Sequence, residues 1–170
     1  MRGSKSGCYG GREYMEKEHS LNLYTLRKST AEDVTFLFNV STRAMRPVVE
    51  AVHPDKVFDR VEEFKLYQNK FIPTEIEVIQ FQSIDIGRLR IVRSAESIYI
   101  GGIQILPEFQ NRGIGTVIVT DLIQESNSVG IPITLEVHEV NTKALNFYKK
   151  LGFVEVGREE GKLSMRYCRG

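Results

Sequence analysis

The sequence contains no tryptophan, only two cysteines and no long apolar run. Cys8 and Cys168 lie at opposite ends of the 170 residues, without the spacing of a metal site, so we interpret them as free thiols in a reducing compartment. The apolar runs fall well short of the roughly 20 residues that span a bilayer. Residues 1–20 lack the apolar core of a signal peptide. These absences predict a cytoplasmic protein with no membrane segment and no bound metal.

The charges of the chain are nearly balanced. Twenty-three Lys and Arg residues stand against 22 Asp and Glu residues, which gives a formal net charge of +1. A general nucleic-acid or membrane-surface binder would show a basic bias, so we expect neither partner. The length suits one domain with a sizeable core. We place that domain at residues 21–170 and interpret residues 1–20 as a disordered N-terminal tail or a remnant of cloning.

A strand, a loop with two glycines and a helix follow one another in the centre of the chain. Ile98–Leu106 is apolar and rich in isoleucine, which is typical of a strand. Pro107 stops the strand because it has no N–H to donate. From Ile114 the apolar residues recur at helical spacing, and Gly130 is placed to end the helix.

The loop between this strand and helix has the chemistry of an anion site. Gly113 and Gly115 allow the backbone to turn sharply and to approach a ligand. The first N–H groups of the helix have no intrahelical partner and carry the positive end of the helix dipole, and Arg112 adds a full charge. We therefore expect a phosphate-type anion here. A lone Gly-x-Gly pair is equally consistent with a plain strand-to-helix turn.

Two common phosphate motifs do not fit the loop. A nucleoside triphosphate loop needs Lys followed by Ser or Thr after its last glycine, whereas Gly115 is followed by Thr116 and Val117. A dinucleotide fingerprint needs a small residue three positions after its second glycine, where this chain has Ile118. Both mismatches argue against a nucleotide-binding α/β protein, which we keep only as a third hypothesis.

A second informative helix begins near Asn141. The Asn141 side chain suits an N-cap that leaves its amide free for a ligand. Tyr148 lies seven residues further on, close to two helical turns, and therefore on the same face. Ala144 lies between them on that face and is small enough to let a ligand arm pass. The alternative is an ordinary amphipathic helix with Tyr148 packed in the core.

The remaining pattern predicts an α/β fold with a mixed central sheet of about seven strands and four helices. Short connections favour antiparallel hairpins between the three strands before the loop, and the helical crossover favours a parallel neighbour after it. The expected strands are residues 21–27, 75–82, 86–93, 97–105, 133–138, 153–158 and 163–168. Four helices are expected. The first begins at Ser29 or Thr30 and ends at Arg46-Pro47, and the second runs from Pro54 to Phe71 with an apolar stripe of Val57, Val61, Phe64 and Tyr67. The third and fourth helices are residues 114–129 and 141–151.

Two motifs resemble signatures of the GNAT superfamily of acyl-CoA-dependent N-acetyltransferases. Gln110–Gly115, which reads Gln-x-x-Gly-x-Gly directly after Ile-Leu-Pro, is similar to its pyrophosphate loop. The segment LEVHEVNTKALNFYKKLGF, Leu135–Phe153, is similar to its second signature, with an Asn at a helix start and a Tyr before Leu-Gly-Phe. The resemblance covers roughly Leu23–Tyr167. It implies a single GNAT-like domain whose strands splay around an acyl-CoA site.

The resemblance also implies a reaction. The expected enzyme transfers an acetyl group from acetyl-CoA, its co-substrate, to a primary amine of a small molecule or peptide by direct attack, without a metal. The backbone of Ile105 is then the expected contact to the thioester oxyanion, and Tyr148 is the expected general acid for the sulfur. The residues expected at the cofactor are Ile103, Gln104, Ile105, Gln110, Asn111, Arg112, Gly113, Ile114, Gly115, Thr116, Asn141, Ala144 and Tyr148.

The general base and the acceptor site are less clearly marked. Many relatives carry a Glu near position 102, whereas this chain has Gly101-Gly102. Glu136 and His138, which share one face of the following strand by alternation, are the weak candidates for the base. A base that acts through water is the alternative. The expected acceptor contacts are Met45, Arg46 and Phe81.

The missing carboxylate keeps a second function open. A non-catalytic sensor or interaction module would bind acyl-CoA without turnover. The edge of the C-terminal hairpin could also pair with a second copy, so a homodimer is a further hypothesis.

Overall fold

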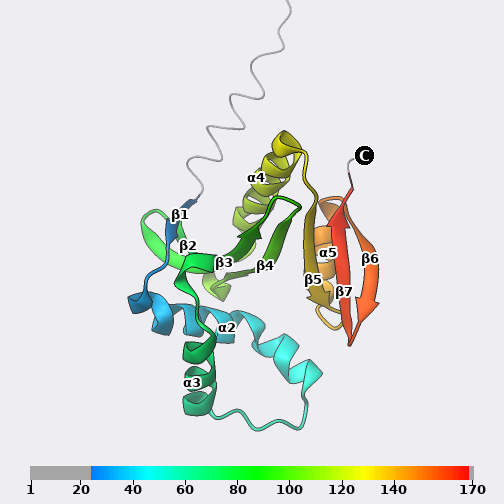
Figure 1. Cartoon of the computed structure of the whole chain (residues 1–170). Coiled ribbons are helices and arrows are strands. Elements are labelled where there is room, and N and C mark those ends of the chain that lie inside the picture. Colours follow the sequence, from blue (N-terminus) through cyan, green and yellow to red (C-terminus); the bar gives the residue numbers. More distant parts are fainter. Residues whose placement is uncertain (1–23, 169–170) are drawn as a thin grey trace, which may run out of the picture.

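The computed structural model describes residues 24–168, and its seven strands form one mixed sheet in the order β1-β2-β3-β4-β5-β7-β6 (Figure 1). Together with four α-helices, this sheet confirms the predicted α/β fold. The strands are β1 (Thr25–Lys28), β2 (Ile76–Phe81), β3 (Ile84–Arg93), β4 (Ile98–Ile105), β5 (Ile133–His138), β6 (Phe153–Glu159) and β7 (Lys162–Tyr167). The helices are α2 (Val34–Val52), α3 (Arg60–Lys70), α4 (Ile114–Val129) and α5 (Thr142–Lys150), with short 3₁₀ turns η1 (Ala31–Asp33), η2 (Pro73–Glu75) and η3 (Pro107–Phe109).

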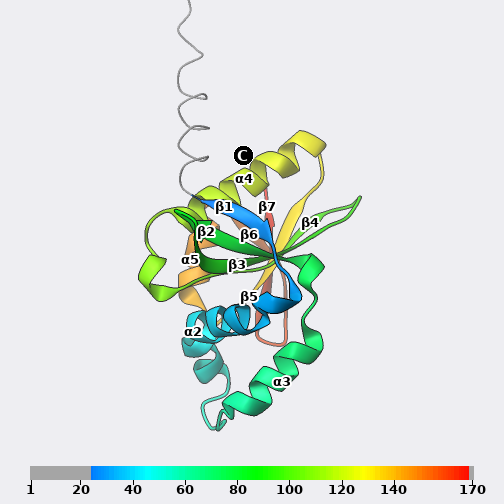
Figure 2. The same ribbon diagram turned by 90° about the vertical axis from the view of Figure 1, so that its left-hand side faces the viewer.

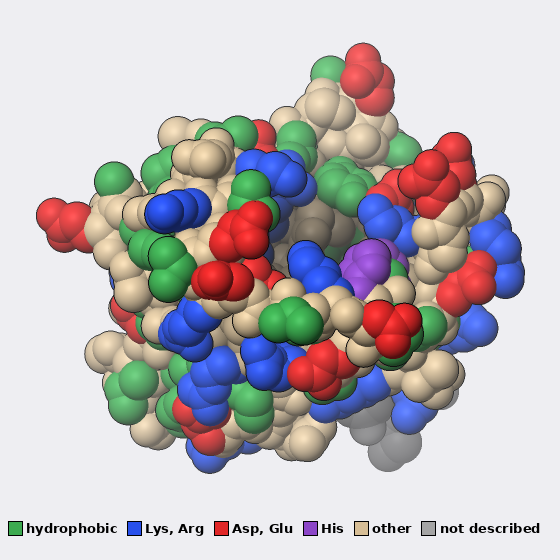
Figure 3. Space-filling view, turned by 90° about the horizontal axis from the view of Figure 1, so that it is seen from below, with side chains coloured by type: hydrophobic (Ala, Val, Ile, Leu, Met, Phe, Trp, Pro, Cys, Tyr) green, Lys and Arg blue, Asp and Glu red, His purple; other side chains and the backbone are tan. Residues whose placement is uncertain are grey.

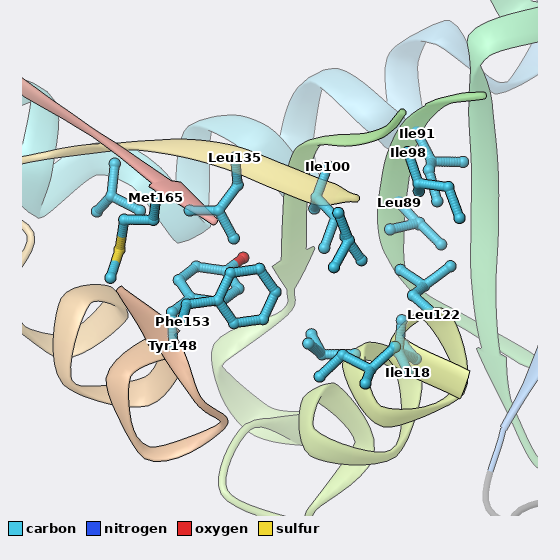
Figure 4. Close-up of a cluster of buried hydrophobic side chains, with 14 of the residues drawn as sticks. Leu89, Ile91, Ile98, Ile100, Ile118, Leu122, Leu135, Tyr148, Phe153 and Met165 are labelled. Carbon is cyan, nitrogen blue, oxygen red and sulfur yellow. The ribbon is translucent and has the colours of Figure 1, made fainter. Parts of the chain in front are cut away.

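Helices cover both faces of the sheet. Figure 2 shows α2 and α3 below the sheet and α4 above it. The main core lies on the α4 and α5 side and is built from isoleucine, leucine and valine together with Tyr148, Phe153 and Met165 (Figure 4). A smaller core of Leu37, Ile76 and Val78 lies under α2 and α3, so the two faces are packed independently.

The sheet divides between β4 and β5. Strands β1 to β4 pair antiparallel in sequence, which confirms the prediction made for β2, β3 and β4. β4 and β5 pair in parallel over only three residues, Ile98–Ile100 against Ile133–Leu135, and Figure 1 shows them diverging beyond that point. The register between β3 and β4 shifts at Gly101, where a β-bulge bends β4. The splayed strands expected from the resemblance are therefore present.

The predicted end of the first helix was wrong. The α2 helix continues through Pro47 to Val52. A proline removes one backbone hydrogen bond, and local propensity alone would end the helix there. The apolar stripe nevertheless continues to Met45 and Val49, which line a cavity between α2 and α3, so the local cost of Pro47 does not end the helix.

The predicted start of the second helix was also wrong. The α3 helix begins at Arg60 instead of Pro54, because the Asp59 side chain accepts hydrogen bonds from the backbone N–H groups of Val61 and Glu62. The predicted apolar stripe holds only in part, since Val57 and Val61 are 91% and 64% exposed. Phe64 and Tyr67 do pack inward, with ring centroids 5.1 and 5.5 Å from that of Phe38.

Several expectations concern the start of the chain. The tail at residues 1–20 lies outside the described residues, as does the first part of the strand expected at 21–27, of which the structure shows Thr25–Lys28. Within residues 24–168, no helix combines the length and the apolar character needed to cross a bilayer.

Candidate acyl-CoA site

The glycine loop places the start of α4 at the mouth of a groove. Gly113 is the N-cap residue of α4 with φ of +79°, a left-handed conformation that glycine adopts at little cost. The first hydrogen bond of the helix joins the Val117 N–H to the Gly113 carbonyl at 3.1 Å. The N–H groups of Ile114, Gly115 and Thr116 therefore have no intrahelical acceptor, which is the arrangement that binds anions.

The two glycines have different roles in this turn. Gly115 already lies within α4 and does not have a positive φ, so Gly113 and Asn111, with φ of +59°, make the turn. A Cβ atom on Gly115 would come 3.7 Å from Phe147, an ordinary contact that the fold tolerates. The sequence predicts a turn made by both glycines, and the structure assigns it to one of them.

Gln110 ties the loop to its surroundings. Its side-chain Nε2 donates to the Ile105 carbonyl at 2.8 Å, and its Oε1 accepts from Lys143 Nζ at 2.8 Å. These bonds join β4, the loop and α5 at one point. The Gln110 side chain therefore holds the loop in shape, and Lys143 brings a cation to the same place.

Arg112 lies near two aromatic rings. Its guanidinium carbon lies 5.2 Å from the ring centre of Phe109 and 5.8 Å from that of Phe81, within the range of cation–π attraction. Its Nη2 also donates to the Glu108 carbonyl at 3.1 Å. Arg43 of α2 forms two hydrogen bonds with the Glu108 carboxylate, at 3.2 and 3.0 Å. Both arginines are thus positioned before any ligand arrives.

The groove has a volume of about 540 Å³, large enough for the acyl and pantetheine part of a coenzyme. Figure 3 shows the molecule from below, with a hollow near the centre of this face bordered by Lys or Arg side chains. Every residue that the sequence places at the cofactor lines this groove. The lining also includes residues that the sequence analysis missed: Arg43, Ala44, Pro47, Pro107, Phe109, Lys143 and Phe147.

Those missed residues carry few local signals. Lys143 lies in the first turn of α5, two residues after the N-cap, and that proximity to Asn141 was the one available signal. Arg43 and Pro47 belong to α2, and no pattern within that helix marks the residues that face the groove. Their approach to the groove depends on how α2 packs on the sheet.

The start of α5 and Tyr148 follow the expected geometry. Asn141 is the N-cap of α5, and its Oδ1 accepts from the Ala144 N–H at 3.1 Å. Tyr148 is 7% exposed, with its ring edge-on to those of Phe147 and Phe153 at 5.0 and 5.5 Å. Figure 4 shows Tyr148 beside Phe153 with its hydroxyl oxygen toward Leu135. Burial raises the pKa of the Tyr148 hydroxyl well above its ordinary value, so the group keeps its proton at neutral pH.

Four residues named as site candidates lie outside the groove lining. Glu136 and His138 share one face of β5, as the alternation predicts, but neither lines the groove, and Glu136 lies 3.9 Å from Lys162 Nζ. Phe81 packs against Phe109 and supports Arg112 from below. The fourth, Arg46, pairs with Glu50 at 3.8 Å in the neighbouring cavity between α2 and α3.

Met45 occupies a different position. It lines both the groove and this second cavity, which has a volume of about 300 Å³. The two hollows therefore adjoin at α2.

The comparisons with known proteins agree with this geometry. A family model described as FR47-like protein matches residues 90–161, which include β4, the loop, α4, β5 and α5. Over 158 residues the chain is 28% identical to an uncharacterised N-acetyltransferase of Methanocaldococcus jannaschii, a match that covers 89% of this chain and 70% of that protein. Over 75 residues it is 32% identical to the thialysine N-epsilon-acetyltransferase of Mus musculus, and this segment spans 44% of each protein.

The solved structures show the same fold. The crystal structure of the PaiA N-acetyltransferase of Thermoplasma acidophilum, in complex with coenzyme A, superposes with a TM-score of 0.67 at 18% identity. The match covers 85% of this chain and 98% of that one. A related architecture is thus known to accommodate coenzyme A.

Proposed function

We propose that the chain is an N-acetyltransferase of the GNAT superfamily, whose groove binds acetyl-CoA and transfers the acetyl group to a primary amine of a small molecule or peptide. The observation that carries the proposal is the start of α4, where three N–H groups without intrahelical acceptors follow the left-handed Gly113. These donors suit the diphosphate of coenzyme A, since they combine hydrogen bonds with the positive end of the helix dipole. Lys143 and Arg43 add positive charge along the same lining.

The rest of the groove suits the pantetheine arm and the thioester. Ile103, Gln104 and Ile105 line it from the splayed part of β4, where the edge facing β5 has no paired strand. An extended amide chain can use the backbone groups of such an edge. A backbone donor at Ile105 would stabilise the oxyanion, and one preorganised donor of this kind lowers a barrier by roughly 3 kcal/mol.

The proposed reaction is direct attack. The amine nitrogen forms a bond to the thioester carbonyl carbon, the carbonyl oxygen becomes the oxyanion, and the C–S bond breaks as the oxyanion collapses. Tyr148 lines the groove with its proton retained, so its hydroxyl can give that proton to the departing thiolate. A base takes a proton from the amine; Glu136, His138 and a base acting through water stay predictions for this role.

A non-catalytic acyl-CoA-binding module is the second candidate function. One observation favours it: the groove lining contains no Asp or Glu among the described residues, and β4 carries Gly101-Gly102 where a catalytic Glu would be expected. Such a module would bind acetyl-CoA in the same groove without releasing free CoA.

The test combines binding with turnover. Calorimetry with acetyl-CoA should detect binding, and a free-thiol assay against a panel of primary amines should detect CoA release that depends on the amine. Binding without release for any amine would favour the module. The absence of binding heat would contradict both functions.

The localisation and the oligomeric state of the protein are also part of the proposal. We infer a cytoplasmic enzyme and a homodimer paired through the β6 edge, where Val154 and Val156 are 44% and 58% exposed. Size-exclusion chromatography with light scattering would reveal a monomer if this edge does not pair.

A further inference from the structure

Three polar side chains between the sheet and the helices α2 and α3 have buried atoms without hydrogen-bond partners among the described residues. These atoms are Arg88 Nε on β3, Gln104 Oε1 on β4 and the Tyr67 hydroxyl on α3. We refer to these residues as the polar trio. A buried polar atom without a partner destabilises a fold, and a charged one does so more strongly, so three together need an explanation.

The polar trio lies next to the groove. Arg88 and Gln104 are directly opposite each other in the β3–β4 pairing, which places their Cα atoms on the order of 5 Å apart and their side chains on one face. The Arg88 guanidinium lies 5.9 Å from the ring centre of Tyr67. Gln104 lines the groove, and Tyr67 lines the second cavity that adjoins it at Met45. Arg88 itself lines neither hollow and lies between Gln104 of the groove and Tyr67 of the second cavity.

Arg88 differs from the other arginines of its strand. Arg90 is 2.7 Å from a carboxylate oxygen of Glu75, and Arg93 is 2.6 Å from one of Glu125. No carboxylate in residues 24–168 forms such a pair with Arg88, and burial lowers the pKa of its guanidinium. A largely buried charge without a counter-charge destabilises a fold, and within residues 24–168 the Tyr67 ring is the contact that faces the Arg88 guanidinium.

We propose that the missing partner of these atoms is a carboxylate on the acceptor. The protein would then acetylate amines that carry a carboxylate a few bonds from the reactive nitrogen. Arg88 and Tyr67 bind the carboxylate, and Gln104 positions the amine. This inference rests on the proposed function and narrows its substrate class to amino acids in which a short spacer separates the amine from the carboxylate. The cluster is complementary to such a molecule. Arg88 and Tyr67 supply donors for the carboxylate, and Gln104 Oε1 supplies an acceptor for an amine N–H.

The short distance across the β3–β4 pair supports a close spacing between the amine and the carboxylate of the acceptor. Gln104 belongs to the part of β4 that would lie beside the thioester, so an amine on its Oε1 is near the acyl carbon. The carboxylate then reaches the neighbouring strand, one strand spacing away. Arg88 and Gln104 act here as binding and positioning residues; the proton transfers are those already described.

The experiment compares each amino acid with its own carboxamide. Wild-type protein is assayed for amine-dependent CoA release with pairs such as L-leucine and L-leucinamide, and β-alanine and its amide. The amides contain the more easily deprotonated amine, so intrinsic reactivity favours them. We expect the acids to have the higher kcat/KM by at least tenfold, the size of a lost hydrogen bond to a charged group. Equal or better use of the amides overturns the proposal.

Variants separate recognition from folding. Arg88→Met should raise KM for the acids at least tenfold and leave the amides and the acetyl-CoA affinity unchanged. Because it removes an unpaired buried charge, it should also raise the thermal midpoint by about 2–4 °C. Arg88→Lys should restore part of the selectivity. Arg93→Met, on the same strand and exposed, is the matched control and should alter neither selectivity nor acetyl-CoA affinity.

The outcomes distinguish this inference from the function on which it rests. CoA release with amides or simple alkylamines, without a preference for acids, would refute the substrate class and keep the acetyltransferase. No release with any amine, together with binding of acetyl-CoA, would refute the acetyltransferase itself. A lowered thermal midpoint of Arg88→Met with unchanged selectivity would assign Arg88 a structural role and overturn the proposal.

Discussion

Tyr148 combines deep burial with access to the groove. Its ring packs against Phe147 and Phe153, and the residue is also part of the groove lining. The hydrophobic packing fixes the ring, and the same packing raises the pKa of the hydroxyl. A phenol in this setting is a positioned proton donor and not a source of negative charge.

Removing this hydroxyl should affect catalysis and spare binding. For Tyr148→Phe we expect kcat to fall at least tenfold with little change in the dissociation constant of acetyl-CoA, because the ring packing is kept and only the proton donor is lost. Steady-state kinetics and calorimetry measure the two quantities. The variant should keep the shape of the wild-type pH profile between about pH 6 and 9, since the raised pKa holds Tyr148 protonated there. Unchanged turnover would remove Tyr148 from the mechanism.

Asp33 shows how one carboxylate secures the entry to α2. Arg27 donates to both of its oxygens, at 2.8 and 2.7 Å, and the Thr30 N–H donates at 2.8 Å. These bonds, the Arg27 contact first, lower the pKa of Asp33 to about 2. Asp85 shares the same guanidinium from β3, at 2.5 Å. The cluster thus ties β1, η1 and β3 together.

The lowered pKa makes this contribution depend on pH in a defined direction. The stabilisation is complete above the unfolded-state pKa of about 4 and is lost as the pH falls toward about 2. We expect the free energy of unfolding of Asp33→Asn to be about 1–2 kcal/mol below that of wild type at pH 7. Between pH 4 and pH 2 the variant should lose less of its unfolding free energy than wild type does, because it lacks the titrating carboxylate. Urea unfolding at a series of pH values measures both effects. Asp55→Asn, an exposed site, is the control and should follow the wild-type curve. Parallel losses in wild type and Asp33→Asn would contradict this account.

At the scale of the element, α4 offers a matched pair of glycines. Gly113 and Gly130 lie at the two ends of the helix, with φ of +79° and +73°. An added Cβ atom would meet no atom within 4 Å at either position. A side chain at either end therefore introduces backbone strain of about 1–2 kcal/mol without a clash. The two ends differ in what they face: Gly113 lines the groove and Gly130 does not.

This pair isolates the anion site from the stability of the helix. We expect Gly113→Asp to weaken acetyl-CoA binding about a hundredfold, because its carboxylate occupies the diphosphate position and repels it. Gly113→Asn, similar in shape but uncharged, should bind more tightly than Gly113→Asp. Gly130→Asp should lower the thermal midpoint and leave binding unchanged. Calorimetry and thermal unfolding provide both readouts. Equal affinities for all three variants would rule out a phosphate at the start of α4.

The sequence could predict those elements whose signals are local. The order of strands and helices, the glycine turn before α4 and the Asn141 cap all follow from residues within a few positions of one another. The course of α2 through Pro47 could not be predicted, because local propensity ends a helix at such a proline, whereas this helix continues to Val52. The start of α3 was recoverable from Asp59, which has Glu62 three residues later.

The candidate site divides in the same way. The residues of the two motifs were predictable because each motif is contiguous and its elements bring it to the groove. The Gln110–Lys143 bond joins residues 33 positions apart, so it depends on how α5 docks beside the loop. The position of Glu136 and His138 outside the groove likewise depends on how β5 diverges from β4, which alternation within one strand does not specify.

At the scale of the whole molecule, two half-sheets share one core. Strands β1 to β4 form one half and β5, β7 and β6 the other, joined in the sheet by three residue pairs. The α4 and α5 helices and the main hydrophobic core connect both halves on one face. A ligand in the groove would therefore contact β4 of the first half and the helix α5, which packs with the second half in the shared core.

Cofactor binding should be visible as local protection of this region. We expect acetyl-CoA to slow amide hydrogen exchange at Ile103–Ile105 and at the start of α4, with little change in β1 and β2, because the ligand supplies partners for exposed backbone groups. Exchange mass spectrometry on free and bound protein measures this. Uniform protection across the sheet would indicate global stabilisation, and no protection at β4 would remove the strand from the cofactor site.

The three-pair junction between Ile98–Ile100 and Ile133–Leu135 has one further consequence. A sheet paired over so short a length should separate there most readily. The first cooperative opening of the native protein should therefore release β5, β6 and β7 and empty the groove in one event. Protease resistance and coenzyme residence time would then report on the same hinge, and a cell depleted of coenzyme would turn this protein over faster.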